Sequence, residues 1–227
     1  MTEPRTERSR VRRHPERGRY ELEAIHAILD EALLCHLGTV VDGRPHVVPT
    51  LHARDGETVY VHGAPANRAL TALRGGSEAC LVVTLLDGLV MARSAFHHSM
   101  NYRSVVVIGP ASEVTDREQK LAAMKALVEH VARGRWEEVR QPSETELQST
   151  VILALSLDEC SAKIRTGDPI DDETDLGGGT WAGVIPLALR AGAPLTAADV
   201  EPGVEVPPSV RDYRLPKGGA SDAWGHS

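Results

Sequence analysis

The side chains that could do chemistry gather in one short segment. Residues 93–109, RSAFHHSMNYRSVVVIG, hold the only phenylalanine of the chain with two histidines, an asparagine and a tyrosine, directly before a run of β-branched residues. His97 and His98 would point to opposite faces of an extended chain, so a zinc site is disfavoured and we expect no metal. Ser94 and Ser99 could serve a hydrolase, but no GxSxG motif accompanies them. Donors of several geometries beside an aromatic ring favour a pocket for a planar heteroaromatic cofactor.

A second candidate segment is residues 44–52, RPHVVPTLH. In a strand its alternate residues, from His46 to His52, share one face. Pro49 removes a ladder hydrogen bond, which marks a sheet edge, a bulge or a place where a ligand approaches the backbone. We expect His46 and His52 to be partly exposed strand residues and not ligands.

A third candidate segment is residues 61–70, VHGAPANRAL, in which a strand end is followed by the start of a short helix that bears Arg68. Free N–H groups at a helix start and an arginine side chain can together bind a phosphate. The alternative, a solvated surface arginine, stays open on the sequence alone.

The elements that must position these segments are mostly strands. Three Asp-Gly pairs, at 42–43, 55–56 and 87–88, lie between short apolar runs and predict β-hairpins. The close antiparallel spacing predicts a barrel or a sandwich. The strands we expect cover residues 33–41, 44–54, 57–62, 79–86, 89–94 and 102–115.

Helices are fewer and flank the strands. Apolar residues at helical spacing predict helices over 21–34, 66–76 and 118–131, with a shorter helical turn over 144–149. Residues 151–157 return to strand, and residues 161–165 are expected to continue it. Beyond Gly192 the chain is rich in Pro, Gly, Ala and acidic residues and has little periodicity, which predicts a loop-rich tail over 191–227.

The composition is that of an ordinary globular protein, with 41% hydrophobic and 25% charged residues. No apolar run approaches the roughly 18 residues that span a bilayer, and the N-terminus has no signal-like apolar segment, so we expect a cytoplasmic protein without a membrane partner. Cys35, Cys80 and Cys160 lack CxxC spacing, which argues against a disulfide framework and a zinc cluster.

The N-terminus differs in charge from the rest of the chain. Residues 1–19 hold seven arginines and three glutamates, whereas the whole chain carries a formal charge of −7. Such an arm could touch nucleic acid or phospholipid, but no aromatic residues are interleaved on which bases could stack. We therefore expect a flexible basic arm over 1–19, without a nucleic-acid partner.

Five motifs together resemble one known family: DGRPHVVPT, YVHGAPANRALTAL, TLLDGLVMARSAFHHSMNYRSVVVIG, SAKIRTGDPIDD and WAGVIPL. They are similar to the pyridoxamine 5′-phosphate oxidase-like superfamily with the FMN-binding split barrel, in its flavin-nucleotide-binding branch related to nitroimidazole-resistance proteins. The similarity covers residues 20–187. It implies an antiparallel split β-barrel over residues 20–190 that forms a homodimer with FMN at the interface.

The resemblance also implies roles for individual residues. Val48, Pro49 and Thr50 would lie along the isoalloxazine ring, and His62, Asn67 and Arg68 would hold the phosphate. Four residues would face the ring or its edge: Ser94, His97, His98 and Ser99. The remaining residues implied at the site are Asn101, Tyr102, Arg103 and Trp181. The dense basic phosphate motif and the pyridoxal-phosphate-binding set of the oxidase proper have no match here, so oxidation of vitamin B6 is not implied.

The function expected on this basis is FMN-dependent oxidation or reduction of a small molecule, with hydride transfer at flavin N5. Two alternatives stay open: a flavin-binding module without catalysis, and an enzyme of the same fold that uses a deazaflavin or haem. The sequence has no nicotinamide fingerprint, so the electron donor is open.

Overall fold

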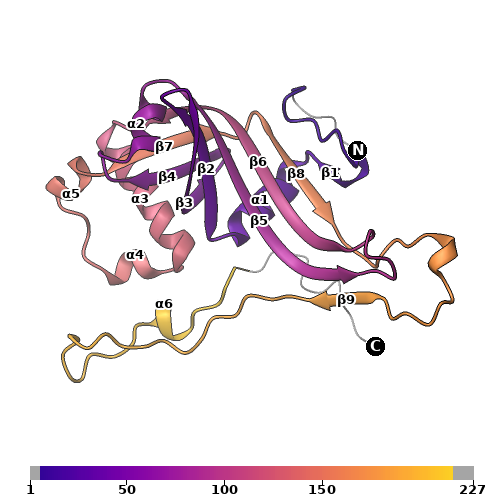
Figure 1. The fold of residues 1–227 in the computed structure, drawn as a ribbon. Coiled ribbons are helices and arrows are strands. Elements are labelled where there is room, and N and C mark those ends of the chain that lie inside the picture. Colours follow the sequence, from indigo (N-terminus) through magenta and orange to yellow (C-terminus); the bar gives the residue numbers. More distant parts are fainter. Residues whose placement is uncertain (1–5, 217–227) are drawn as a thin grey trace.

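The computed structural model describes residues 6–216, and a closed antiparallel β-barrel forms its centre (Figure 1). The barrel strands pair in the circular order β2, β3, β4, β7, β6, β5 and back to β2. Their bounds are Leu34–Val41 for β2, Arg44–Asp55 for β3, Thr58–Gly63 for β4, Glu78–Met91 for β5, Ser99–Glu113 for β6 and Val151–Ser156 for β7. The predicted mainly β fold, an antiparallel split β-barrel with flanking helices, is confirmed.

Shorter strands extend the sheet beyond the barrel. β8 (Cys160–Arg165) pairs with β6, β1 (Gly18–Arg19) pairs with β8, and β9 (Gly183–Pro186) pairs with β5. β5 and β6 continue past the barrel as a long ribbon, and β9 lies beside β5 at its end (Figure 1). We call residues 85–103 together with β9 the β5–β6 extension.

Two of the three expected Asp-Gly hairpins are present. Asp42 and Gly43 have φ angles of 51° and 72° and join β2 to β3, and Gly56, with a φ of 56°, joins β3 to β4. The third prediction is wrong, because β5 runs through Asp87 and Gly88 with a register shift against β6. The expected strands 79–86 and 89–94 are therefore one strand. A Cβ on Gly88 would lie 3.0 Å from the carbonyl oxygen of Ile185. The glycine therefore allows β9 to approach β5 closely, and it does not form a turn.

The expectation that residues 161–165 continue the strand over 151–157 is also wrong. A turn at residues 157–159 separates β7 from β8. β7 pairs with β6 at residues 111–113, whereas β8 pairs with β6 at residues 102–107. The long β6 thus belongs to both halves of the sheet, and each half has its own partner strand.

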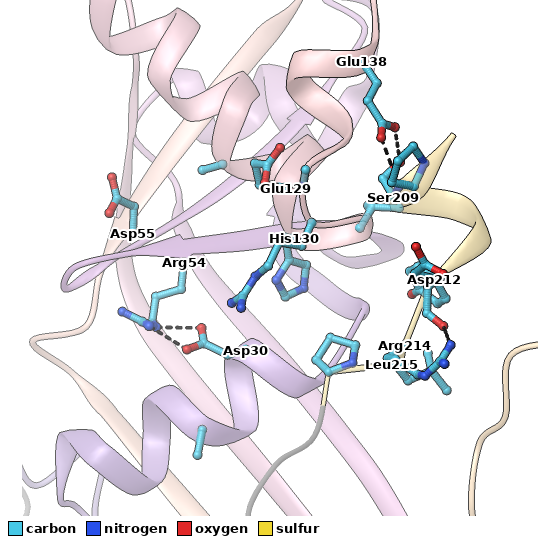
Figure 2. A pocket seen from close by; sticks show the side chains of 18 residues that line it. Asp30, Arg54, Asp55, Glu129, His130, Glu138, Ser209, Asp212, Arg214 and Leu215 are labelled. Carbon is cyan, nitrogen blue, oxygen red and sulfur yellow. Dashed lines mark hydrogen bonds and ion pairs between the residues drawn. The ribbon is translucent and has the colours of Figure 1, made fainter. Parts of the chain in front are cut away.

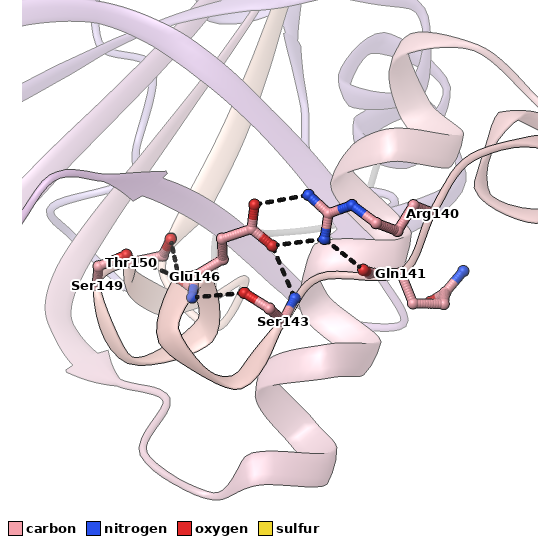
Figure 3. Close-up of polar contacts among 6 residues, drawn as sticks. All are labelled: Arg140, Gln141, Ser143, Glu146, Ser149 and Thr150. Carbon is pink, nitrogen blue, oxygen red and sulfur yellow. Dashed lines mark hydrogen bonds and ion pairs between the residues drawn. The ribbon is translucent and has the colours of Figure 1, made fainter.

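Helices flank the barrel, at α1 (Leu22–Glu31), α2 (Arg68–Arg74), α3 (Arg117–Val131), α4 (Arg135–Glu138) and α5 (Glu144–Gln148), whereas α6 (Pro208–Arg211) contacts α4 in the C-terminal segment (Figure 1). Figure 3 shows how α5 begins: Ser143 Oγ accepts a hydrogen bond from the Glu146 N–H, and the Glu146 carboxylate accepts one from the Ser143 N–H. The same carboxylate accepts two hydrogen bonds from Arg140, which lowers the pKa of Glu146 to about 2.

The core lies inside the barrel and under α1 and α2. α1 buries Ile25, Ile28 and Leu29, and α2 buries Leu70 and Leu73. The inward residues of the strands complete the core: Leu37, Val59, Val61, Leu81, Val83, Val105, Val107, Leu153 and Leu155. Burial of these apolar side chains holds the helices on the barrel.

The termini lie along the outside of the barrel. Arg8 forms ion pairs with Glu78 (2.8 Å) and Glu159 (3.1 Å), and the Val11 N–H donates to the Tyr20 hydroxyl at 2.8 Å. Between residues 191 and 216 the chain is mostly exposed, and the short α6 is the regular element described there. Residues 1–5 and 217–227 of the expected arm and tail lie outside the described residues. No helix within residues 6–216 is long and apolar enough to cross a membrane.

Candidate functional site

The predicted site residues fall into two groups in one protomer. The first, which we call the barrel-end group, comprises Val48, Pro49, Thr50, His62, Asn67 and Arg68. The second, the extension group, comprises Ser94, His97, His98, Ser99, Asn101, Tyr102, Arg103 and Trp181. Figure 1 shows α2 at one end of the barrel, whereas β9 and the far part of β5 and β6 project from the other end.

The backbone edge of β3 distinguishes the barrel-end group. Residues 44–51 of β3 pair with β2, but in the described part of the chain the pairing with β4 begins only at His52. The other edge of residues 44–51 is therefore left without a strand partner, as the position of Pro49 indicated. Backbone N–H and C=O groups on this edge can bind a ligand or a second chain.

The outer face of the same sheet is apolar. Leu34 pairs directly with Leu51, and Gly38 pairs with Val47. Exposed fractions on this face run from 37% for Leu51 to 62% for Val47. We call this surface the outer sheet face, and its large exposed residues are Leu34, Val40, Val47, Leu51, Leu86 and Met100. Exposed apolar side chains that share one face mark interaction sites, and the exposed His36 and Thr84 lie among those of the outer sheet face.

Charged and polar groups lie beside α2. A hollow of about 410 Å³ is lined by Val41, Asp42, Arg44, Pro45, His46 and Arg68. Arg68 Nη2 donates to Asp42 Oδ2 at 3.2 Å, and both side chains are exposed. Two guanidinium groups against one carboxylate leave a positive charge in this hollow, which suits an anion.

The start of α2 offers fewer free N–H groups than the sequence suggested. The Asn67 side chain accepts hydrogen bonds from the N–H groups of Ala69 (3.0 Å) and Leu70 (3.3 Å), so it caps the helix. The backbone donors that we expected to help bind a phosphate are thus partly used. Nearby His62 is half-buried, its Nδ1 has no partner among the described residues, and burial lowers its pKa.

The loop of the extension group folds on itself. The Ser94 carbonyl oxygen accepts hydrogen bonds from the His97 N–H (3.2 Å) and the His98 ring (3.0 Å). His97 Nε2 lies 3.2 Å from Asp172 Oδ2, and its ring stands edge-on to Phe96. Ser99 begins β6 beside Val90 of β5. These contacts fix the loop against the segment that follows β8.

Arg103 and Asn101 are buried and already have partners. Arg103 donates to both oxygens of Asp87 (2.8 and 3.0 Å) and to both oxygens of Glu31, one of them at 2.9 Å. The hydrogen bonds to Glu31, followed by those to Asp87, raise the pKa of Arg103. Asn101 donates to the Gly167 carbonyl at 3.1 Å and accepts from Arg165.

The other two members of the extension group are accessible. Tyr102 is half-buried on β6, and Trp181 is 67% exposed, with its ring beside Gly183. The roles of all the predicted site residues in flavin binding stay predictions.

A large cavity lies away from both groups. It has a volume of about 1000 Å³ and lies between α1, α3, α4, α6 and the turn after β3. Figure 2 shows Asp30 paired with Arg54 on one side, and on the other side Ser209, which donates two hydrogen bonds to Glu138. His130 lies on the wall and contacts the carbonyl oxygen of Ala32 at 2.8 Å.

Behind His130 lies His52, which we expected to be partly exposed. That expectation is wrong, because the ring is fully buried. Its Nε2 lies 3.0 Å from the carbonyl oxygen of Leu29, and its centroid lies 5.0 Å from that of His130. Burial, with a smaller effect from His130, lowers the pKa of His52 to about 4.

Several polar residues that matter to the site region were missed in the sequence. Asp87 was interpreted as part of a turn, and Glu31 and Arg165 as ordinary helix and strand residues. Asp171 accepts hydrogen bonds from the N–H and the guanidinium of Arg93 at 2.8 and 2.7 Å. The acidic run over residues 171–175 is visible in the sequence, but the metal-free expectation rested on the spacing of histidines and cysteines and not on these carboxylates.

A closed antiparallel barrel with helices at its ends and an extended strand pair defines a protein of the split-barrel class. The family model described as pyridoxamine 5′-phosphate oxidase matches residues 21–164. The chain therefore belongs to the pyridoxamine 5′-phosphate oxidase family. No curated protein matches the chain.

Solved structures support this assignment. The flavocytochrome Anf3 from Azotobacter vinelandii is 38% identical with a TM-score of 0.89, over 94% of this chain and 100% of that one. The FAD and haem binding protein from Mycobacterium smegmatis is also 38% identical, with a TM-score of 0.83, over 86% of this chain and 96% of that one. A protein described as a 5-nitroimidazole antibiotic resistance protein, from Bacteroides thetaiotaomicron, shares the fold at 20% identity and a TM-score of 0.55, over 65% of this chain and 86% of that one.

Proposed function

We propose that this chain binds a flavin nucleotide at the interface of a homodimer and uses it to oxidise or reduce a small molecule. The observation that carries the proposal is the 38% identity with a flavocytochrome over 94% of the chain. The position of the two groups supports it as well. Helix α2, which bears Arg68, and the far part of β5 and β6 lie at opposite ends of one protomer, so a second protomer seated on the outer sheet face could complete one site from both (Figure 1).

The chemistry of the barrel-end group fits a flavin nucleotide. Arg68 and Arg44 line a positively charged hollow that suits a phosphate, and the unpartnered Nδ1 of His62 lies at the end of β4, just before α2. The free edge of β3 at Val48, Pro49 and Thr50 offers backbone donors and acceptors for a planar ring with carbonyls.

A bound flavin supplies hydride or electron transfer, and the protein supplies binding, orientation and exclusion of water. In our proposal the apolar outer sheet face excludes water from the ring. The hydroxyls of Ser94 and Ser99, from the second protomer, orient the ring by hydrogen bonds. Arg68 holds the phosphate through its guanidinium, since part of the α2 backbone donors are used by Asn67.

Different observations favour different cofactors. The motif resemblance favours FMN, whereas the two relatives at 38% identity are named for FAD and haem or as a flavocytochrome. A second candidate function is therefore electron transfer between a flavin and a haem held by the same protein.

The decisive experiment is mass spectrometry of the ligands released from protein purified without added cofactor, combined with its visible absorption spectrum. We expect FMN or FAD, and a haem spectrum in addition if the second candidate is correct. Absence of any flavin, together with no binding of added FMN or FAD, would contradict the proposal.

Dimerisation is tested separately by sedimentation equilibrium of the flavin-loaded protein at micromolar concentration. We expect a dimer, because the outer sheet face is apolar and exposed in one protomer. A monomer with flavin bound would contradict the shared site but not flavin binding itself.

A further inference from the structure

We propose that His97, Asp172 and Asp175 form a binding site for one divalent transition-metal ion, which joins the loop over residues 92–98 to the segment after β8. This site shares His97 with the residues expected to face the flavin ring, but its test needs no bound flavin. It also differs from the metal-free expectation drawn from the sequence, which rested on the spacing of histidines and cysteines.

The geometry of the three side chains suits one ion. One ligand atom from each residue lies within 4.8 Å of the other two, and His97 Nε2 lies 3.2 Å from Asp172 Oδ2. With bonds of about 2.0–2.2 Å to nitrogen and oxygen, ligand atoms around one ion stand about 3–3.6 Å apart. Small side-chain rotations are enough to close the present spacing to that value.

The donor set points to a class of metal. One imidazole and two carboxylates form a mixed nitrogen and oxygen set, which suits Zn²⁺, Co²⁺, Mn²⁺ or Fe²⁺. Ca²⁺ is disfavoured because it takes about 6–8 oxygen ligands. Three protein ligands leave coordination positions for water, since the Asp172 side chain is 72% exposed.

The local charge favours a cation at this place. The segment over residues 168–175 contains five acidic residues and no lysine or arginine. The nearest arginine, Arg93, is bound to Asp171, whose side chain is 1% exposed. Within residues 6–216 no lysine or arginine pairs with Asp172 or Asp175, and the His97 ring is the described partner of the Asp172 side chain. A divalent cation would remove the repulsion between the two carboxylates.

The ligands are held in place by neighbours that are not ligands. Arg93 and Asp171 tie the two segments together beside the site, and the short 3-10 helix Glu173–Asp175 fixes Asp175 relative to Asp172 through a backbone hydrogen bond of 2.9 Å. His97 is fixed by its backbone bond to Ser94. A metal ion would therefore bind to loops that are already adjacent.

The experiment is isothermal titration of Zn²⁺ into full-length protein that has been treated with a chelator and then dialysed. We expect saturable binding of one ion per protomer, weaker binding of Mn²⁺ and none of Ca²⁺. His97→Ala and Asp175→Asn should each weaken Zn²⁺ affinity by about tenfold or more. Loss of a group that only supports a ligand already weakens metal affinity by about tenfold, and these residues are ligands themselves.

Matched controls separate this site from other surface groups, because the chain has ten histidines. His98→Ala removes the adjacent histidine and Glu173→Gln removes a neighbouring acidic charge, and both variants should keep the affinity for Zn²⁺. Equal losses in His97→Ala and His98→Ala, or no saturable binding to the wild-type chain, would overturn the proposal.

The visible spectrum of bound Co²⁺ gives a second readout. Asp175→Asn changes the charge but hardly the shape, so the variant is expected to fold. Its Co²⁺ spectrum should differ from that of the wild-type complex in the position and intensity of the ligand-field bands, and identical spectra would show that Asp175 is not a ligand.

Discussion

The barrel-end group and the extension group differ in how their polar side chains are satisfied. At the barrel end, Arg68 is exposed with one contact to an exposed Asp42, and His62 Nδ1 has no partner among the described residues. In the extension, Arg103 and Asn101 are buried and bonded to Glu31, Asp87, Arg165 and Gly167.

This difference distinguishes two roles that residue type alone does not. A buried arginine with two carboxylates holds segments of the chain together, and removing it leaves charges without a partner. An exposed arginine with one weak contact costs little to redirect toward a ligand. We therefore expect changes at the buried Arg103 and Asn101 to act on stability and changes at the exposed Arg68 to act on flavin affinity.

The largest effect should come from Arg103→Ala. The substitution leaves Glu31 and Asp87 mostly buried without their cation, so the free energy of unfolding should fall by about 3–5 kcal/mol. Urea unfolding measures it. Arg68→Ala is the control at the barrel end and should change the free energy of unfolding by less than about 0.5 kcal/mol. Equal stability of the two variants would remove the distinction between the groups.

The next effect concerns two histidines whose buried Nδ1 has no partner among the described residues, His52 and His62. His52 is fully buried, and its pKa in the folded protein is about 4 against 6.5 for an unperturbed histidine. Between these values the unfolded chain binds a proton that the folded chain does not. The free energy of unfolding should therefore fall as the pH drops from 6.5 to 4, by about 3 kcal/mol from this residue.

Urea unfolding of the wild type and His52→Gln across this pH range isolates that contribution, because the other titrating groups are common to both. The fall with decreasing pH should be smaller in His52→Gln. If both proteins lost stability in parallel, the His52 ring would be protonated in the folded state, and its burial would not control its charge.

The third prediction tests the barrel end directly. Arg68→Ala should weaken binding of FMN or FAD by about ten- to a hundredfold, since a hydrogen bond to a charged group contributes about 1.5–3 kcal/mol. Riboflavin, which lacks the phosphate, should bind almost equally to both proteins. Flavin fluorescence titration of the apo protein measures all three ligands.

Arg74→Ala is the matched control on the same helix, because Arg74 pairs with Glu113 and does not line the hollow. It should leave flavin affinity unchanged. If Arg68→Ala weakened riboflavin as much as FMN, Arg68 would support the fold of α2 and not the phosphate.

The sequence predicted features that depend on neighbouring residues better than features that depend on distant ones. Alternation of apolar residues and the pair Asp42-Gly43 were enough to predict β2, β3 and their turn. Asp87-Gly88 has the same local signal, but its carboxylate pairs with Arg103, 16 residues away, and its glycine admits β9. His52 was misjudged because the residues that bury it come from α1 and α3.

The candidate site shows the same limit. The family motifs identified residues one by one, but they did not indicate that Arg103 meets Glu31, 72 residues away, or that the loop over 92–98 meets Asp171 and Asp172. The motifs also could not indicate which residues a second protomer would contribute to the site.

The smallest effect should come from removing the basic N-terminal arm, with a chain that begins at Arg19. Its described contacts lie at Tyr20, at Glu78 at the start of β5, at Glu159 in the turn before β8 and at Lys163 on β8, and not on the barrel-end group. The ion pairs of Arg8 involve a half-exposed guanidinium, and such exposed pairs contribute little to stability. For a chain of this size about 1 kcal/mol corresponds to about 2–4 °C in Tm.

The truncated protein should thus melt within a few degrees of the full chain and keep its flavin, and Arg8→Ala should account for part of the shift. Loss of flavin without a larger loss of stability would show that the arm contributes to the cofactor site of the dimer, so that the barrel-end and extension groups are not its only parts.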